Sequence, residues 1–531
     1  MYRAIVNANV VTMDPDCPAA SALAWRDGAI ALVGDDRQAA ALADEVIDLG
    51  GRTVVPGLCD THLHLLMLGA MLDQCDLSGL TGVDAVVDAI RRYIEDRNPP
   101  PGAWVYARGF NHELFADRRL PGRRDLDRAS ERHPIRATRV CGHMAVANTA
   151  ALNALGISRG TQAPPGGRID VDAGAFYENA IGLLAPRGHS PDRGYIKRCL
   201  AAAADIASAA GLTAVHSEDF GTLGCDPAEV IAAYRELEAE GKLPLRVYQQ
   251  CSLPTVEDID GFFDAGHRMG GCGLYRLHAI KLFADGSLGA RTAWLSRPYA
   301  DDPLARGMAI MPQRELDALV LAAHRRGAPA VIHAIGDAAV HAALDAIERA
   351  QWTLPDWRPR HGVIHLQITD RSALSRFREL DVEAYCQPVF VGTDWPIVEA
   401  RVGDLAATSY QWKALLDGGV NVSGGSDCPV EPLDPLFNLC CAATRQDAQG
   451  RPEGGWLPGQ RLSAYDALRL FTVNAASAAG DGGRRGMLRE GCAADLTVLD
   501  RDILSVAPED IRRARPLMTI VAGEIRHRKG A

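Results

Sequence analysis

One pattern recurs along the chain: a helix-like segment, a glycine, a short apolar strand and then a polar residue. It occurs in YIKRCLAAAADIASAAGLTAVHSED, ELDALVLAAHRRGAPAVIHAIGD and YQWKALLDGGVNVSGGSD, whose strands end near His216, His333 and Asp427. Alternating helices and strands are typical of parallel sheets. In a chain of 531 residues this pattern predicts an α/β fold built on a (β/α)8 barrel. Polar residues at the carboxyl ends of such strands converge on one face, where we expect the functional site.

The two ends of the chain differ from the middle. Residues 1–56 and 486–531 have the pattern of short strands separated by turns, whereas residues 57–485 carry the helix–strand repeat. Chain termini often lie close together, so we expect both ends to form one small β-sandwich-like domain. We expect the first barrel strand to end near Leu66. The Gly-, Pro- and Arg-rich stretch at about 75–195 is too long for a barrel loop and predicts an insertion that carries part of the substrate pocket.

Composition argues against several classes of protein. The formal net charge of -11 and the pI near 5.8, without a basic stripe, predict no nucleic-acid partner. No signal peptide is indicated and no window reaches the length of a membrane span, so we expect no membrane partner. The 13 cysteines include no C-x-x-C pair, which favours a reducing compartment. These features indicate a cytoplasmic protein. A small-molecule substrate and a homodimer are both compatible with them.

The strongest motif is VVPGLCDTHLHLL, which places two histidines near the end of an apolar strand. Strand residues two apart share a face, so Asp60, His62 and His64 should point the same way. Two imidazoles on one face can chelate a divalent metal ion, although such histidines can also be core residues. The carboxylate on the same face and the polar residues downstream favour the metal site.

The stretch HAIKLFADGS puts Lys281 in an apolar run that predicts a buried strand. A desolvated ammonium is costly unless it finds a partner, so the alternatives are that its head reaches solvent, pairs with Asp285 or serves a function. His333, His365 and Asp427 also have ordinary structural roles open to them, as core histidines and a turn residue. Their order on successive strand ends, together with Lys281, favours one metal centre.

These motifs resemble those of the amidohydrolase superfamily, metal-dependent hydrolases on a (β/α)8 barrel with a small β domain from both termini. The closer resemblance is to the branch with the N-substituted formamide deformylases and YtcJ-type hydrolases. It covers nearly the whole chain. The matching stretches are PGLCDTHLHL, GHMAVANTAAL, KLFADGSLGARTAWL, VIHAIGDAAV, GGSDCPVEPLDPL and GMLREGCAADLTVLD.

The resemblance implies a ligand set for two divalent metal ions. His62, His64 and Asp427 would hold the more buried ion, and His333 and His365 the second. Lys281, carboxylated on its amine, would bridge them. Nitrogen and oxygen ligands suit zinc, with manganese, iron and cobalt as alternatives. The chain departs from relatives that often have glutamate where it has Ile364, which we expect to affect a supporting hydrogen bond but not a ligand.

Elementary chemistry supports this assignment. A protonated Lys281 would place a cation against the metal ions, whereas the neutral amine of a buried lysine can take up carbon dioxide. A metal ion lowers the pKa of bound water towards about 7. Asp427 can accept a proton as general base and pass it to a leaving nitrogen as general acid. We therefore expect hydrolysis of a non-peptide C–N bond, such as that of an N-substituted formamide or an N-acyl compound.

Four further residues are weaker candidates for substrate binding: His143, Glu178, His216 and Arg291. Two alternative functions remain open. One is a mononuclear deaminase of a heterocyclic amine, although such sites generally lack the bridging lysine. The other is a catalytically silent metal-binding relative with a regulatory role, against which the intact ligand set argues.

Overall fold

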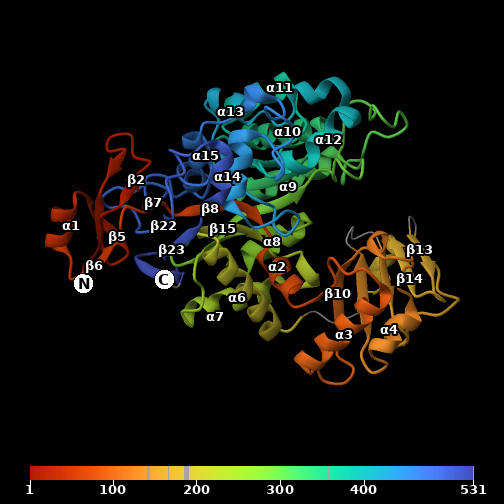
Figure 1. The fold of residues 1–531 in the computed structure, drawn as a ribbon. Helices are drawn as coiled ribbons and strands as arrows, with labels where there is room; N and C mark the ends of the chain where they lie inside the picture. The colour runs from red at the N-terminus through yellow and green to blue at the C-terminus, as the bar shows by residue number, and fades with distance from the viewer. Residues whose placement is uncertain (140–143, 165–166, 185–190, 357, 530–531) are drawn as a thin grey trace. The chain divides into compact units, whose positions relative to one another are not determined.

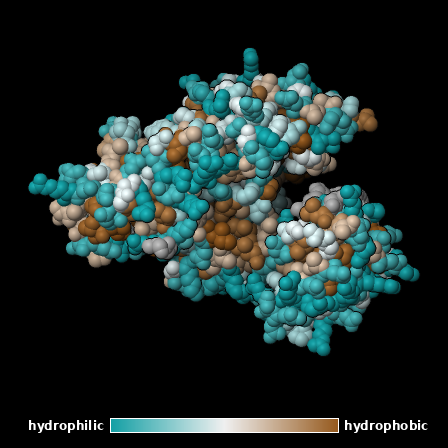
Figure 2. All heavy atoms as spheres, viewed as in Figure 1, coloured by the Kyte–Doolittle hydropathy of each residue, from teal (hydrophilic) through white to brown (hydrophobic). Residues whose placement is uncertain are grey.

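The protein divides into two compact units in a computed structural model that describes residues 1–139, 144–164, 167–184, 191–356 and 358–529. The main unit comprises residues 1–68 and 192–531, and the inserted unit comprises residues 69–191. Hydrophilic residues cover much of the face shown in Figure 2. Over the described residues, no helix combines the length and apolar character needed to cross a membrane.

A parallel sheet of eight strands, counted over the described residues, forms the centre of the main unit (Figure 1). The strands pair in chain order, and each pairing is parallel. The backbone amide of Asp427 donates to the carbonyl of His62 at 2.7 Å, which joins the last strand's loop to the first strand and nearly closes the barrel. The predicted (β/α)8 architecture is confirmed. The strands are β8 (Leu58–Leu63), β15 (Leu212–Glu218), β16 (Arg246–Ser252), β17 (Tyr275–Phe283), β18 (Ala330–Ala334), β19 (Gly362–His365), β20 (Glu383–Cys386) and β21 (Val422–Gly424).

Helices between these strands bury one side each. In α10 (Asp337–Thr353), Ala339, Ala343 and Ile347 are buried at helical spacing. The predicted glycine stops are present, because Gly211 and Gly327 have φ of 92° and 70°, a region that favours glycine. The other main-unit helices are α2 (Leu65–Leu72), which runs into the inserted unit, α6 (Arg193–Ala209), α7 (Pro227–Ala239), α8 (Val256–Asp264), α9 (Gln313–Arg325), α11 (Arg371–Glu379), α12 (Phe390–Val402), α13 (Trp412–Asp417), α14 (Pro435–Thr444), α15 (Ala464–Leu470) and α16 (Val473–Ala478).

Strands from both ends of the chain share one sheet, as the red and blue strands of Figure 1 show. Its order is β24-β23-β22-β7-β2-β3, and β7 pairs antiparallel with β22. A second sheet, β5-β4-β1-β6, packs on it through a common apolar core that includes Trp25, Val54 and Leu496. This is the small β-sandwich expected from the termini. The elements are β1 (Arg3–Val6), β2 (Asn9–Val11), β3 (Ala19–Ala20), β4 (Ala22–Arg26), β5 (Ala29–Gly34), α1 (Asp36–Leu42), β6 (Glu45–Asp48), β7 (Thr53–Pro56), β22 (Leu496–Leu499), β23 (Pro516–Val521) and β24 (Glu524–Arg528).

The inserted unit has a sheet and a core of its own. The sheet order is β13-β14-β12-β11-β10-β9, and the core includes Val86, Ile90, Phe110 and Ile135. Its elements are β9 (Cys75–Asp76), α3 (Val83–Arg97), β10 (Val105–Phe110), α4 (Arg123–Ala129), β11 (Ile135–Arg139), β12 (Met144–Ala147), α5 (Thr149–Ala154), β13 (Gly167–Asp170) and β14 (Ala175–Glu178). The predicted domain boundaries and the role of the insertion in substrate binding stay predictions.

Two strands are shorter than the sequence predicts. The first barrel strand ends at Leu63 rather than near Leu66, because the chain turns there into α2. The Oγ of Ser217 and a carboxylate oxygen of Asp219 accept from the amides of Leu65 and Leu66, two of the first helical amides that need an acceptor. The last strand ends at Gly424, and the chain then forms a loop in which Asp427 has φ of 59°.

Candidate metal centre

Polar side chains from the carboxyl-terminal half of each barrel strand, or from the residues just after it, meet at one end of the barrel. The strand order explains this convergence, because parallel strands end at the same edge. In chain order these side chains are His62 and His64, Glu218, Gln250, Lys281, His333, His365, Gln387 and Asp427.

The closest group consists of His62, His365 and Asp427. Each offers a ligand atom, and these atoms lie within 4.8 Å of one another. Asp427 Oδ1 lies 3.4 Å from His62 Nε2 and 3.1 Å from His64 Nε2. His62, His365 and Asp427 are therefore within reach of a common cation, and His64 contacts the same carboxylate.

Two glutamines orient the histidines of this group. Gln250 Oε1 lies 2.7 Å from His62 Nδ1, and Gln387 Oε1 lies 2.8 Å from His365 Nδ1. A carbonyl oxygen can only accept, so each Nδ1 carries the hydrogen and each Nε2 keeps its lone pair. Such a partner on the outer nitrogen fixes the tautomer of a metal-binding histidine. Neither glutamine was singled out from the sequence.

Lys281 lies inside the barrel and is 1% exposed. Its Nζ is 3.4 Å from His62 Nε2, and it does not reach solvent. Burial lowers the pKa of Lys281 to about 8, although the carboxylates of Asp427 and Glu218 oppose this shift. The amine is thus much nearer its neutral form at physiological pH than a lysine in water.

His333 lies beside the group, with its ring centroid 4.4 Å from that of His365. Its Nε2 donates to the carbonyl of Gly286 at 3.0 Å and lies 3.5 Å from Asp285 Oδ1. Asp285 in turn accepts from the backbone amides of Ile335 and Gly336, which holds the loop after β18. Asp285 therefore supports His333 and not Lys281.

Asp60 braces the loop that carries Asp427. Its carboxylate accepts from the amides of His62 and Ser426 at 3.0–3.1 Å. Burial raises the pKa of Asp60 to about 7, against the effect of these hydrogen bonds. Gly425 makes the approach possible, because a Cβ there would lie 2.7 Å from His62 N and 2.9 Å from Asp60 Oδ1.

The pKa of His64 is shifted in the opposite direction from the pKa values of the other three histidines. Burial holds the pKa of His62 and His333 well below the ordinary value and lowers that of His365 to about 4. Burial also opposes the charged form of His64, but hydrogen bonds to Asp427 and Glu218 raise its pKa to about 10. Burial raises the pKa of Asp427, yet the hydrogen bond from His64 and the other nearby histidines hold it well below its usual range.

The substrate-binding candidates lie in different places. His143 is outside the described residues, and Glu178 ends β14 of the inserted unit. Arg291 donates to Asp301 at 2.8 Å in the loop after β17. His216 is fully buried lower in the barrel, where its ring packs against His278, and neither ring nitrogen has a hydrogen-bond partner among the described residues. Their roles in substrate binding stay predictions.

The donor set fits a divalent metal ion. Neutral imidazoles and a carboxylate are the forms that bind one, and three histidines here are held neutral. His64 and Asp427 share a proton at 3.1 Å, which a bound cation would replace. A parallel barrel with such a group at its carboxyl end is typical of metal-dependent hydrolases.

The chain belongs to the amidohydrolase family, whose profile matches residues 45–527. It is 33% identical to "Putative amidohydrolase YtcJ" of Bacillus subtilis (strain 168), over 91% of each chain. It is 30% identical to the N-substituted formamide deformylase of Arthrobacter pascens, over 99% of this chain and 98% of that one. An uncharacterized metal-dependent hydrolase from Pyrococcus furiosus superposes with a TM-score of 0.81 at 28% identity, covering 95% of this chain and 100% of that one. The resemblance predicted from the motifs is confirmed.

Proposed function

We propose that the protein is a binuclear metal-dependent hydrolase of a non-peptide C–N bond, with an N-substituted formamide or an N-acyl amine as substrate class. The observation that carries this proposal is the group of His62, His365 and Asp427 beside a buried Lys281. The N-substituted formamide deformylase similar to this chain over nearly its whole length supports the substrate class.

The side chains of this group would supply the ligands for both ions. His62, His64 and Asp427 would hold one ion, His333 and His365 the other, and carboxylated Lys281 would lie between them. Divalent ions supply an activated water at neutral pH and polarise the carbonyl of the substrate. Zinc suits these ligands, and manganese, iron and cobalt share the preference for nitrogen and oxygen donors.

Asp427 performs the proton transfers in this proposal. Its Oδ1 faces His62 and His64, and its side chain is held at the centre of the group. It accepts a proton as the water oxygen bonds to the carbonyl carbon, and it delivers that proton to the nitrogen as the C–N bond breaks. The products are a carboxylic acid, formic acid in the case of a formamide, and an amine. Asp60 positions the loop of Asp427 through the amide of Ser426.

The test combines metal analysis with product analysis. Purified protein is assayed for metal per chain and incubated with N-substituted formamides, N-acyl amines and heterocyclic amines. We expect two ions per chain, and equal amounts of acid and amine from one amide class. The Asp427→Asn variant should lose this turnover, whereas Asp466→Asn, a surface change on α15, should retain it.

Two results would contradict the proposal. Ammonia from a heterocycle without a carboxylic acid indicates a deaminase. A metal-loaded protein that turns over no member of the panel indicates a catalytically silent protein with a regulatory role. One relative has a regulatory role in its name, the exoenzymes regulatory protein AepA of Pectobacterium carotovorum, which is 24% identical over 72% of this chain.

A further inference from the structure

A cavity lies at the opposite end of the barrel from the metal centre. Its volume is about 710 Å³, and it is bounded by the first residues of barrel strands and by the turn after α16. Tyr248 and Arg276 come from the starts of β16 and β17, and Arg360 precedes β19. Because the metal centre lies at the carboxyl ends of these strands, the cavity faces their amino ends.

Positive charge exceeds negative charge in the cluster beside this cavity. Four guanidinium groups share two carboxylates, and the cluster consists of Arg246, Arg276, Arg484, Arg485, Asp481 and Asp495. Both carboxylate side chains are 4% exposed. The cluster therefore has two more cations than acids, and Arg484 lies at its edge, where the side chain is 72% exposed.

The carboxylate of Asp481 already has several hydrogen-bond and ion-pair partners. It lies 3.2 Å from Arg276, 2.8 Å from Arg484 and 3.6 Å from Arg485. It also accepts from the hydroxyl of Tyr248 at 2.5 Å. A single carboxylate that already has four donors cannot neutralise three guanidinium groups.

Two residues of the lining also have a buried nitrogen without a partner. Among the described residues, the Nε of Arg276 and the Nε2 of His278 are buried and have no hydrogen-bond partner. Both residues border the cavity. The surplus of positive charge lies beside the same cavity, which favours an anionic ligand.

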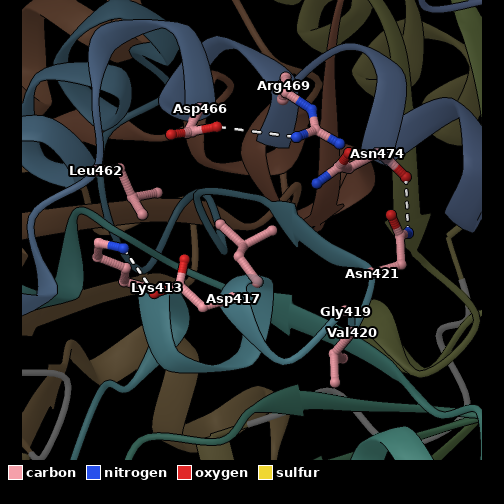
Figure 3. A pocket seen from close by; sticks show the side chains of 10 residues that line it. Lys413, Asp417, Gly419, Val420, Asn421, Leu462, Asp466, Arg469 and Asn474 are labelled. Atoms are coloured by element: carbon pink, nitrogen blue, oxygen red, sulfur yellow. Dashed lines mark hydrogen bonds and ion pairs between the residues drawn. The ribbon is translucent and has the colours of Figure 1, made fainter.

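A nearby pocket provides a contrast (Figure 3). It has a volume of about 270 Å³ and lies between α13, α15 and α16. Its charged residues form two pairs, Lys413 with Asp417 at 2.6 Å and Arg469 with Asp466 at 3.8 Å. Cations and acids are equal in number there, so the charged residues of that pocket have no net charge.

We propose that the cavity at the amino end of the barrel binds a small oxyanion with two negative charges, either a phosphate ester or a dicarboxylate. Guanidinium groups present parallel N–H donors that match both kinds of oxyanion. The strands that border the cavity, β16 and β17, also carry Gln250 and Lys281 further along. The ligand would therefore lie beneath the metal centre and is distinct from its substrate.

The test measures binding of inorganic phosphate and of succinate to the metal-loaded protein by calorimetry, at an ionic strength fixed with chloride. We expect one saturable site for at least one of the two, and a melting temperature that rises with its concentration. Tighter binding of phosphate indicates a phosphate ester, and tighter binding of succinate indicates a dicarboxylate.

Arginine variants locate the site. Arg484→Gln changes a side chain that is 72% exposed, so the fold should tolerate it, and Arg276→Gln removes a guanidinium from the lining. Each variant should bind the anion at least tenfold more weakly than the parent does. Arg91→Gln, on α3 of the inserted unit, is the control and should bind as the parent does. Unchanged affinity in folded Arg484→Gln and Arg276→Gln, as expected for an anion bound at the metal centre, would overturn the proposal. So would affinities for phosphate and succinate no greater than for chloride.

Discussion

Lys281 is a buried residue whose amine faces His62 at 3.4 Å. If it bridges the metal ions, Lys281→Met should reduce the metal content below two per chain and lower kcat/KM by about 100-fold or more. Because the change removes a polar group from an apolar strand, the metal-free variant should unfold at no lower temperature than the metal-free parent.

Metal analysis, steady-state kinetics and thermal unfolding measure these three effects. Lys413→Met alters a partly exposed lysine and should change neither metal content nor kcat/KM. Two ions and full activity in Lys281→Met would show that the lysine is not a ligand.

Gln387 supports a ligand without being one. Its Oε1 accepts from His365 Nδ1 at 2.8 Å, so Gln387→Leu leaves that N–H without a partner and the ring free to turn. We expect metal affinity to fall about 10–100-fold. Competition with a chelator measures the affinity. Gln351→Leu, which loses a bond to the carbonyl of Leu380 on a distant helix, should retain the parent's affinity. Equal affinities in the two variants would contradict this role.

At the scale of the elements, β8 and the loop after β21 are held together by a close approach at Gly425. A Cβ there would lie 2.7 Å from His62 N, so Gly425→Ala must push the loop of Asp427 away from β8. We expect a loss of about 1–3 kcal/mol in the free energy of unfolding and weaker metal binding.

Urea unfolding and chelator competition test this prediction. Gly261→Ala in α8 is the matched control, because a Cβ there meets nothing within 4 Å and alanine favours a helix. It should be neutral or stabilising. A Gly425→Ala variant as stable as the parent would show that the two segments can separate at no cost.

A histidine pair links α9 to the segment before β19. His361 Nδ1 accepts from the amide of Ala330, so its Nε2–H donates to His324 Nδ1 at 2.8 Å, and His324 Nε2 donates to Leu354 O. Each ring therefore accepts at Nδ1 and donates from Nε2. Burial lowers the pKa of His361 to about 3, whereas an unfolded histidine has a pKa of about 6.5.

The unfolded chain therefore binds a proton that the folded chain does not, and stability is lost as the pH falls below about 6.5. His361 alone should remove about 2 kcal/mol from the free energy of unfolding between pH 7.5 and 5. Urea unfolding of the metal-free protein at several pH values measures this slope. It should be smaller in His361→Gln and unchanged in His267→Gln, a partly exposed control. Identical slopes in all three proteins would contradict the assignment.

At the scale of the whole molecule, the sequence pattern predicted the barrel strands better than it predicted the details of the metal centre. Apolar runs along strands, with glycine stops after helices, placed His62 and Lys281 on barrel strands and His64 directly after one, because these signals are local. Ile364 packs with Ala279 and Val331, which lie two residues before Lys281 and His333 on their strands and share their inward face. Alternation along the strand does not carry over to His365, because its φ is 78°.

The supporting residues could not be predicted in the same way. Gln250 and Glu218 contact His62 and His64 from strands more than 150 residues away in the chain, and polar residues near strand ends are too common to identify alone. The left-handed conformation of Asp427 depends on its amide reaching His62, which is a tertiary contact. Position near the carboxyl end of a barrel strand is the one signal that all these residues share.

Metal removal tests how the site is coupled to the fold. The candidate ligands come from β8, β17, β18, β19 and the loop after β21, so a bound ion ties the first barrel strand to the last. Since a metal binds the folded chain, its removal should lower the free energy of unfolding, by about 4 kcal/mol where free metal exceeds its dissociation constant 1,000-fold. Hydrogen exchange should rise in these barrel strands and stay unchanged in β10, β11 and β12, because the inserted unit has a separate core. Added zinc should reverse both effects. A rise in exchange as large in the inserted unit as in the barrel would show that the metal stabilises the chain as one cooperative body.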